Sequence, residues 1–393
     1  MSFRKRNIGL SAGIQRTTAP KDPTNQPTQA TIPGLRPSPI DGRPTTSTGT
    51  PTLDNLLAGH TGLALGSSLL IEESGTTDFA GALLRYYAAE GIVQEQQIHV
   101  VGLDPQWAAT LPGLIGTAEA ADAKPKEKGE KMKIAWRYER LGNFGTGIAP
   151  SRVPAAVANK NANPSTSTPA APAVFCHAFD LTKRLTHPGL PSVDFIQLST
   201  PAQPGSPFSS VIQRLSQAMS NSPPHTIHRV IVPSLLSPAL YPPQASKPEY
   251  VLQFLHYIRA LLSTHSDCMT AMITLPLSLY PRSTGLVRWI EYLSDGVIEL
   301  APFPHSAHSN SSATSGAATA GDEPPQGMLK IHRLPVFHER GGGADKNTGE
   351  DWAFTFSRRK FTIKPFSLPP VDGDNEAQQH DPSSGKGKAD LEF

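Results

Sequence analysis

Apolar residues follow two alternating patterns between about residue 66 and residue 300 of this 393-residue chain. Continuous apolar runs a few residues long are typical of buried strands, and the segments between them carry apolar residues three or four positions apart, which is helical spacing. This alternation predicts an α/β fold whose mostly parallel sheet is covered by helices on both faces. The predicted strands are residues 68–71, 97–103, 194–198, 228–236, 269–275 and 296–300.

The predicted helices have recognisable ends. Ser206 followed by proline is a typical N-cap, and Pro248 suits the first position of a later helix. The helix predicted over residues 78–91 is expected to stop near Gly91, because glycine is common just after a helix end. The spacing of Leu286, Trp289, Ile290 and Leu293 predicts a short later helix.

Other segments flank or interrupt this core, which is predicted to span residues 47–302. Residues 1–46 are rich in Pro, Thr and Gln and begin with basic residues, which predicts a disordered N-terminal tail. Residues 146–173 have the low complexity of an insertion, and residues 369–393 that of a polar tail. Strand-like runs at residues 328–335, 352–357 and 360–366 predict an antiparallel C-terminal β extension over residues 327–368.

Residues 68–91 have the strand–turn–helix layout of a phosphate-binding loop, in which backbone N–H groups and a helix N-terminus meet the anion. A working loop reads G-x-x-x-x-G-K-[ST]. Aligned from Glu72, the four defined positions are Glu72, Thr77, Asp78 and Phe79, and none matches. The chain has no lysine between Lys21 and Lys124. The sequence therefore predicts a degenerate P-loop without its phosphate-binding lysine.

Several strings of residues resemble one family over nearly the whole chain. They are SFRKRNIG at residues 2–9, STGTPTLDNLL at 47–57, MKIAWRYERL at 132–141, DLEF at 390–393, and GMLKIHRLP and RRKFTIKPFSLPP near the C-terminus. Together they resemble the family of the fourth subunit of the Elongator complex, which is RecA-like. The first and third strings are fairly specific to that family, whereas active RecA-like ATPases share the second.

The resemblance implies a role within an assembly. It implies a heterohexameric ring with the fifth and sixth Elongator subunits, two copies of each, attached to the catalytic part of Elongator. It further implies that the ring binds tRNA and supports the 5-carboxymethyl modification of the wobble uridine (mcm5, ncm5 and mcm5s2) in the cytoplasm and nucleus. The resemblance implies a non-catalytic subunit, so no catalytic residue is expected here. No metal ligand is expected either, because the thirteen histidines show no His/Cys spacing typical of a metal site.

The resemblance also suggests where residual nucleotide contacts would lie. In active RecA-like enzymes an acid at the end of the second strand orients water, and Asp104 is at that position here. Asp104-Pro105 is equally an ordinary turn. The strand at residues 228–236 contains Ser234 where those enzymes have an aspartate for magnesium. The candidate nucleotide-binding residues are Ser74, Gly75, Thr76, Thr77 and Asp104, with ATP expected only at ring interfaces.

Net charge limits where RNA could bind. The formal charge is only +2, so any tRNA contact must come from a few local cations. Arg282 is the only charged residue in the predicted loop of residues 276–285, and it is the candidate tRNA contact. A solvated surface arginine is the alternative. Trp136 and Tyr138, two positions apart, suit either a base-stacking platform or ordinary packing.

Cysteines and hydropathy exclude two classes of protein. Two cysteines, Cys176 and Cys268, cannot build a disulfide framework, and they suggest a reducing compartment. No apolar run reaches the 18 residues or so of a membrane span, so no membrane partner is expected. The basic start is also typical of a mitochondrial transit peptide, but its prolines argue against a long amphipathic helix. Because the family resemblance begins at Ser2, a retained tail is favoured.

Two other classes of function remain as alternatives. A stand-alone P-loop ATPase, or a RecA-like recombination mediator, needs a lysine and a strand-end acid that the chain lacks at the expected positions. The other alternative is a scaffold that never contacts nucleic acid. Only a measurement of nucleic-acid binding would distinguish it from the ring subunit. The family strings outside the core favour the Elongator subunit, because a generic ATPase has no need of them.

Overall fold

The computed structural model describes residues 32–57, 60–115, 174–186, 193–198, 205–304, 325–335 and 351–366. The basic start, the insertion at 146–173, Trp136, Tyr138 and the polar C-terminal tail lie outside the described residues. Residues from Pro33 onward belong to one unit, which contains every helix and strand of the described residues.

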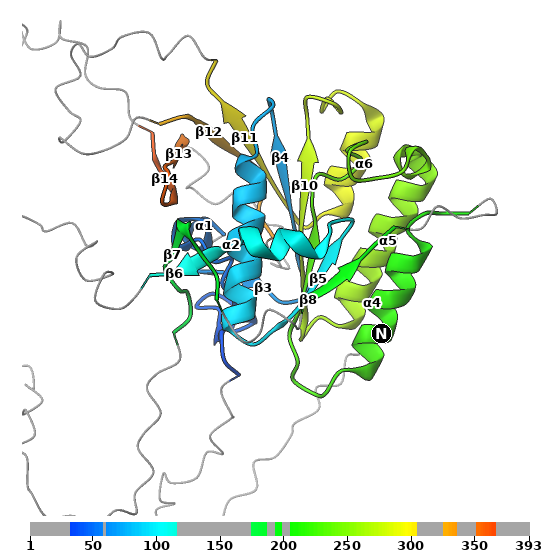
Figure 1. Cartoon of the computed structure of the whole chain (residues 1–393), viewed down its shortest axis with the longest axis horizontal. Helices are drawn as coiled ribbons and strands as arrows, with labels where there is room; N and C mark the ends of the chain where they lie inside the picture. Colours follow the sequence, from blue (N-terminus) through cyan, green and yellow to red (C-terminus); the bar gives the residue numbers. More distant parts are fainter. Residues whose placement is uncertain are drawn as a thin grey trace, which may run out of the picture. The chain divides into compact units, whose positions relative to one another are not determined.

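The centre of the fold is a nine-stranded sheet in the order β14-β13-β12-β11-β4-β10-β9-β5-β8. The six strands from β11 to β8 run parallel to one another. The predicted α/β class with a mostly parallel sheet is therefore confirmed (Figure 1). The parallel strands are β4 Ser68–Glu73, β5 Gln97–Val101, β8 Val193–Ile196, β9 His228–Val232, β10 Met269–Pro276 and β11 Gly296–Pro302.

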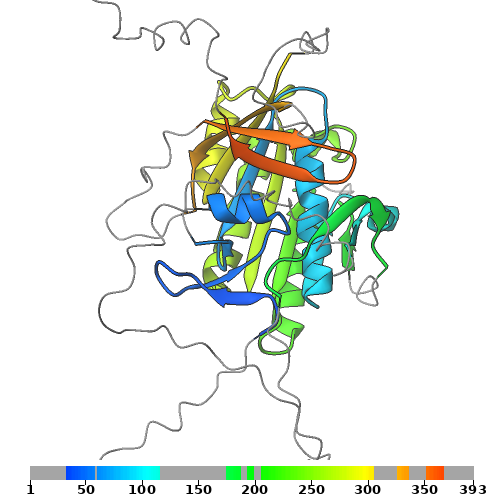
Figure 2. The same cartoon turned by 90° about the vertical axis from the view of Figure 1, so that its left-hand side faces the viewer.

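The C-terminal strands extend this same sheet beyond β11 in an antiparallel manner. They are β12 Gly327–Arg333, β13 Trp352–Phe356 and β14 Phe361–Pro365. Figure 2 shows β13 and β14 in orange at this edge. The predicted antiparallel extension is confirmed, and it continues the parallel sheet directly through the β11–β12 pair.

Helices cover both faces of the sheet because side chains alternate along each strand. On β4, Leu69 and Ile71 belong to one apolar core and Leu70 to the other. The first core is closed by α1 Pro51–Leu56 and α2 Phe79–Val93. The second is closed by α4 Ser209–Asn221, α5 Pro248–Thr264 and α6 Gly285–Leu293. Among the described helices, none is long and apolar enough to cross a membrane.

Smaller elements lie beside the main sheet. They comprise an antiparallel sheet of β1 Leu35–Pro37, β2 Pro44–Thr46 and β3 Leu63–Ala64, the pair β6 Pro112–Leu114 and β7 Phe179–Arg184, and 3-10 helices at Pro105–Thr110 and Pro243–Ser246. β1 and β2 fall within the predicted disordered tail, so the ordered chain begins before residue 47. The hydroxyl of Thr46 accepts a 2.7 Å hydrogen bond from the fully buried Arg229, a polar contact that apolar periodicity cannot reveal.

Three helices differ in detail from what their sequence suggests. α2 continues through Gly91 to Val93, because Gly91 is a contact point at which an added Cβ would lie 2.5 Å from Ile98 Cδ1. Ser206 is not the N-cap of α4, which begins at Ser209. Trp289 on α6 is 58% exposed and does not join the buried face.

Candidate functional site

The strand that precedes the degenerate P-loop is two residues longer than predicted. β4 continues to Glu73, so Glu72 and Glu73 are its last residues rather than the first residues of a turn. Alternation along the strand sends the two carboxylates to opposite faces of the sheet. Glu73 reaches the first residues of α2, whereas Glu72 lies beside Arg282, in the loop before α6.

The carboxylate of Glu73 occupies the N-terminus of α2. Its Oε1 accepts hydrogen bonds from the Thr77 hydroxyl at 2.7 Å and from the Phe79 backbone N–H at 3.1 Å, and its Oε2 accepts one from the Ala80 N–H at 2.9 Å. Exposed helical N–H groups attract anions, and here the protein supplies its own. Burial raises the pKa of Glu73, while the three hydrogen bonds favour its charged form.

Little space remains where a triphosphate would bind. A cavity of about 50 Å³ lies at the loop, lined by residues that include Glu73, Gly75, Thr77, Asp78 and Ser234. Small-molecule sites usually enclose about 300–1,000 Å³. Asp78 is also anionic and is paired with Arg85 at 3.0 Å. In size and charge, this loop is unsuited to a nucleotide.

The predicted nucleotide-binding residues are only partly brought together. Gly75 and Thr77 line the small cavity, and the Thr77 hydroxyl is already bonded to Glu73. The Ser74 hydroxyl points instead to Glu299, at 3.3 Å from Oε1. Thr76 is exposed and, in the described part of the chain, is not among the residues lining the cavity.

Asp104 lies away from the loop. β9 and β10 separate its strand, β5, from β4. Asp104 is at the N-cap position of the 3-10 helix Pro105–Thr110, and its Oδ1 accepts a 3.3 Å hydrogen bond from Gln197. This geometry favours the turn interpretation over a role in orienting water.

Ser234, by contrast, does reach the loop. It lines the same small cavity, and its backbone N–H donates a 2.6 Å hydrogen bond to the Thr274 hydroxyl. Its φ of +40° is uncommon for a residue with a side chain. The strand end thus brings a neutral hydroxyl to the position where a magnesium ligand was sought.

Arg282, the candidate tRNA contact, is paired with the carboxylate of Glu291. Its Nε donates to Glu291 Oε1 at 2.7 Å and its NH2 donates to Oε2 at 3.1 Å, a two-pronged pair. The hydrogen bonds that Arg282 donates to Glu291 raise the pKa of Arg282 above its usual value. A tRNA phosphate would have to displace Glu291 from Arg282. The contact between Arg282 and tRNA stays a prediction.

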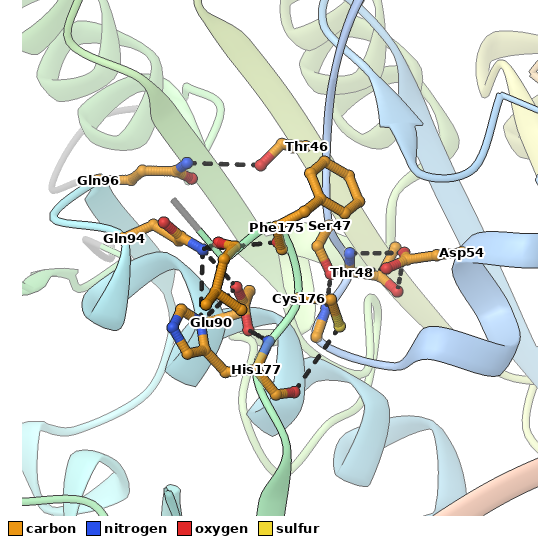
Figure 3. Close-up of polar contacts among 12 residues, drawn as sticks. Thr46, Ser47, Thr48, Asp54, Glu90, Gln94, Gln96, Phe175, Cys176 and His177 are labelled. Atoms are coloured by element: carbon orange, nitrogen blue, oxygen red, sulfur yellow. Dashed lines mark hydrogen bonds and ion pairs between the residues drawn. The ribbon is translucent and has the colours of Figure 1, made fainter. Parts of the chain in front are cut away.

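A polar network that sequence reasoning missed explains the Ser-Thr-Gly string (Figure 3). Asp54 accepts the Ser47 hydroxyl at 2.6 Å, and also both the hydroxyl and the N–H of Thr48, at 2.6 and 2.8 Å. Burial raises the pKa of Asp54. Gly49 has φ +76°, and a Cβ there would lie 2.4 Å from the Tyr86 carbonyl. The string therefore joins α1 to α2 rather than binding a ligand.

A second group of hydrogen bonds attaches the segment after the insertion to α2. Buried Glu90 accepts the His177 N–H at 2.9 Å, and its other oxygen lies 3.0 Å from His177 Nδ1. Gln94 donates to Glu90 and to the Val174 carbonyl, each at 2.8 Å. Figure 3 shows Glu90, Gln94 and His177 converging from α2 and this segment. The signal available in the sequence was a single glutamate, Glu90, within an otherwise apolar helical stretch.

The PAXNEB protein family model matches residues 28–393. The chain belongs to the PAXNEB family. Among its relatives, Elongator complex protein 4 of Schizosaccharomyces pombe is 32% identical over 381 residues, covering 92% of this chain and 94% of that protein. The human protein of the same name is 25% identical, over 94% of this chain and 85% of that protein. The resemblance to the family of the fourth Elongator subunit is thereby confirmed.

PAXNEB membership is accompanied by a distant similarity to a solved structure. A KaiC-like protein from the archaeon Pyrococcus horikoshii matches with a TM-score of 0.41 and 12% identity, over 82% of this chain and 99% of that one.

Proposed function

We propose that this chain is a non-catalytic subunit of the Elongator complex. It joins the fifth and sixth subunits in a heterohexameric ring, and that ring attaches to the catalytic part of the complex. The ring binds tRNA and supports 5-carboxymethyl modification of the wobble uridine, in the cytoplasm and nucleus. The proposal is supported by relatives named Elongator complex protein 4 that align with about nine-tenths of the chain.

The observation that carries the non-catalytic part of the proposal is Glu73. A P-loop enzyme uses the N–H groups at the start of its helix, with a lysine, to bind the β- and γ-phosphates. Here the Phe79 and Ala80 N–H groups are bonded to Glu73 instead. A second anion at this position would meet the charges of Glu73 and Asp78. The stand-alone ATPase is disfavoured for this reason, and ATP is expected only at ring interfaces.

One surface supports the proposal of protein partners. Trp289 and Tyr292 on α6 are 58% and 61% exposed. Trp and Tyr are enriched at the centres of protein interfaces, because they bury a large area at little cost in entropy. Trp289 and Tyr292, whose ring centroids lie 6.1 Å apart, form an aromatic surface, and we propose that a neighbouring ring subunit covers it.

The test is reconstitution. The chain is purified alone, then with the fifth and sixth subunits, and the masses are measured under native conditions. We expect a ring with two copies of each subunit only when all three are present, and tRNA binding that weakens with salt only for the ring. A chain that stays separate from both partners would contradict the proposal. So would ATP turnover by the isolated chain at the rate of a normal P-loop enzyme.

A further inference from the structure

Three neighbouring strands bring Glu72, Glu299 and His332 together on the α6 side of the sheet. Glu72 on β4 is the register partner of Glu299 on β11. His332 is on β12, the next strand of the sheet. One potential ligand atom from each of the three residues lies within 4.8 Å of the others. His332 Nε2 and Glu299 Oε2 are already 2.8 Å apart.

Glu72 is a fully buried carboxylate, 0% exposed, that accepts no hydrogen bond from the described residues when it is ionised. It can bond to the nearby Glu291 carboxyl only through a shared proton. Arg282 Nε lies 3.2 Å from Oε2, but its one hydrogen is directed to Glu291 at 2.7 Å. Arg282 thus attracts Glu72 electrostatically but donates no hydrogen bond to it. A buried polar group in this condition is costly, and a bound ion or water is the usual explanation.

Three carboxyl groups gather beside one guanidinium. The charges of Glu291 and Glu299 both act on Glu72, and Arg282 lies 3.2 Å from its Oε2. Glu299 is itself paired with His332 at 2.8 Å. Lys330 lies 3.4 Å from Glu299, and its side chain is 54% exposed, so it can move into solvent when another cation arrives.

We propose that Glu72, Glu299 and His332 bind a zinc ion, with a fourth position open to water. One imidazole and two carboxylates form a ligand set that zinc accepts, whereas magnesium and calcium prefer oxygen ligands alone. Ligand atoms around tetrahedral zinc lie about 3.5 Å apart, so the present spacing needs shifts on the order of 1 Å. His332 reaches the surface and offers the route of entry.

A proton on Glu72 is the competing explanation. Burial, then the nearby charge of Glu291, raises the pKa of Glu72 to about 8. A protonated Glu72 would need no metal, and its glutamine variant would mimic it. The two explanations therefore predict opposite results for Glu72→Gln in zinc binding.

The experiment uses the full chain, untagged and stripped of metal with a chelator. Zinc is titrated in competition with a chromophoric chelator, and the melting temperature is followed in parallel. We expect one zinc per chain and a rise in melting temperature. The variants Glu72→Gln and His332→Gln should each bind roughly tenfold or more weakly, because even the loss of a group that only supports a metal ligand costs about 10–100-fold in affinity. His256→Gln, an exposed histidine of α5 outside the cluster, should bind as the wild type does.

Two results would overturn the proposal. One is the absence of zinc binding by the folded wild-type chain. The other is equal binding by the wild type, Glu72→Gln and His332→Gln, which would place the ion elsewhere or assign Glu72 its proton alone. Circular dichroism of each variant confirms that it is folded. Because the isolated chain is used, the result is independent of ring assembly.

Discussion

Replacing Glu73 with glutamine tests whether the Glu73 carboxylate acts as the anion bound at the N-terminus of α2. Glutamine keeps the size of the side chain but removes the charge and one acceptor. Its oxygen can still accept from Thr77 and Phe79, but its NH2 group then faces the Ala80 N–H, which bonds to Oε2 in the native chain at 2.9 Å. We expect the variant to be less stable at neutral pH.

The magnitude follows from the contacts that change. A hydrogen bond to a charged group contributes about 1.5–3 kcal/mol, and a carboxylate at a helix N-terminus adds about 0.3–1 kcal/mol. Because burial raises the pKa of Glu73, relief of the burial cost outweighs these gains. The loss expected for glutamine comes from the buried Ala80 N–H left without its acceptor, about 1–3 kcal/mol. A net loss of about 2 kcal/mol is expected, or roughly 4–8 °C in melting temperature for a domain of this size.

The assay is urea unfolding of the full chain, with Asp78→Asn as the matched control. Asp78 belongs to the same turn, but its side chain is 66% exposed and makes a surface pair with Arg85. Such pairs contribute about 0–1 kcal/mol, so the control should change stability little. Equal stability of Glu73→Gln and the wild type would refute the interpretation of Glu73 as the bound anion.

A second variant tests the site from the opposite direction. Glu73→Ala leaves the N–H groups of Phe79 and Ala80 without their acceptor. Phosphate or sulfate should then raise the melting temperature of Glu73→Ala more than that of the wild type, since a ligand of the folded state stabilises it. An identical response of the two proteins would show that Glu73 does not exclude anions.

Three further predictions concern packing, pH and assembly. Gly91→Ala should cost about 1–3 kcal/mol in urea unfolding, because its Cβ would overlap a packed side chain. Gly285→Ala, with open space around it, should cost far less; equal effects would contradict this account. Burial lowers the pKa of His228 to about 4, so the unfolded chain binds more protons between about pH 6.5 and 4, and stability falls as the pH falls. The free energy of unfolding should fall by up to about 3 kcal/mol over this range. In His228→Gln the urea unfolding midpoint should depend less on pH between about pH 7 and 4.5, and an unchanged pH dependence would exclude His228 as the source. Trp289→Asp, on the aromatic surface, should abolish ring assembly in native mass measurements without lowering the melting temperature of the isolated chain; a ring that still forms would remove this surface from the interface.

The layered architecture was readable from the sequence because it depends on local periodicity. A parallel strand buried on both faces must be continuously apolar, and the six predicted runs became the six parallel strands. The C-terminal strands were predicted for the same reason. The missing lysine of the P-loop was equally plain, because that motif needs particular residues at particular positions.

The ends and faces of elements were less predictable, because tertiary packing decides them. Glycine is typical of a helix end, yet α2 continues past Gly91 to Val93. The glycine is instead required because a Cβ at this position would overlap Ile98. Trp289 has the spacing of a core residue, yet α6 turns it to the surface. In both cases a neighbouring element overrides the local preference.

The contents of the candidate sites were decided by the tertiary structure alone. The sequence showed two adjacent acids after an apolar run, but not that one would bind the start of α2 while the other meets residues of β11 and β12. Which side chains meet depends on strand order and register, and these are set by long-range pairing across the sheet. Local pattern therefore determined which elements form, and only their assembly determined that Glu73 fills the anion site and that Glu72 lies beside Glu299 and His332.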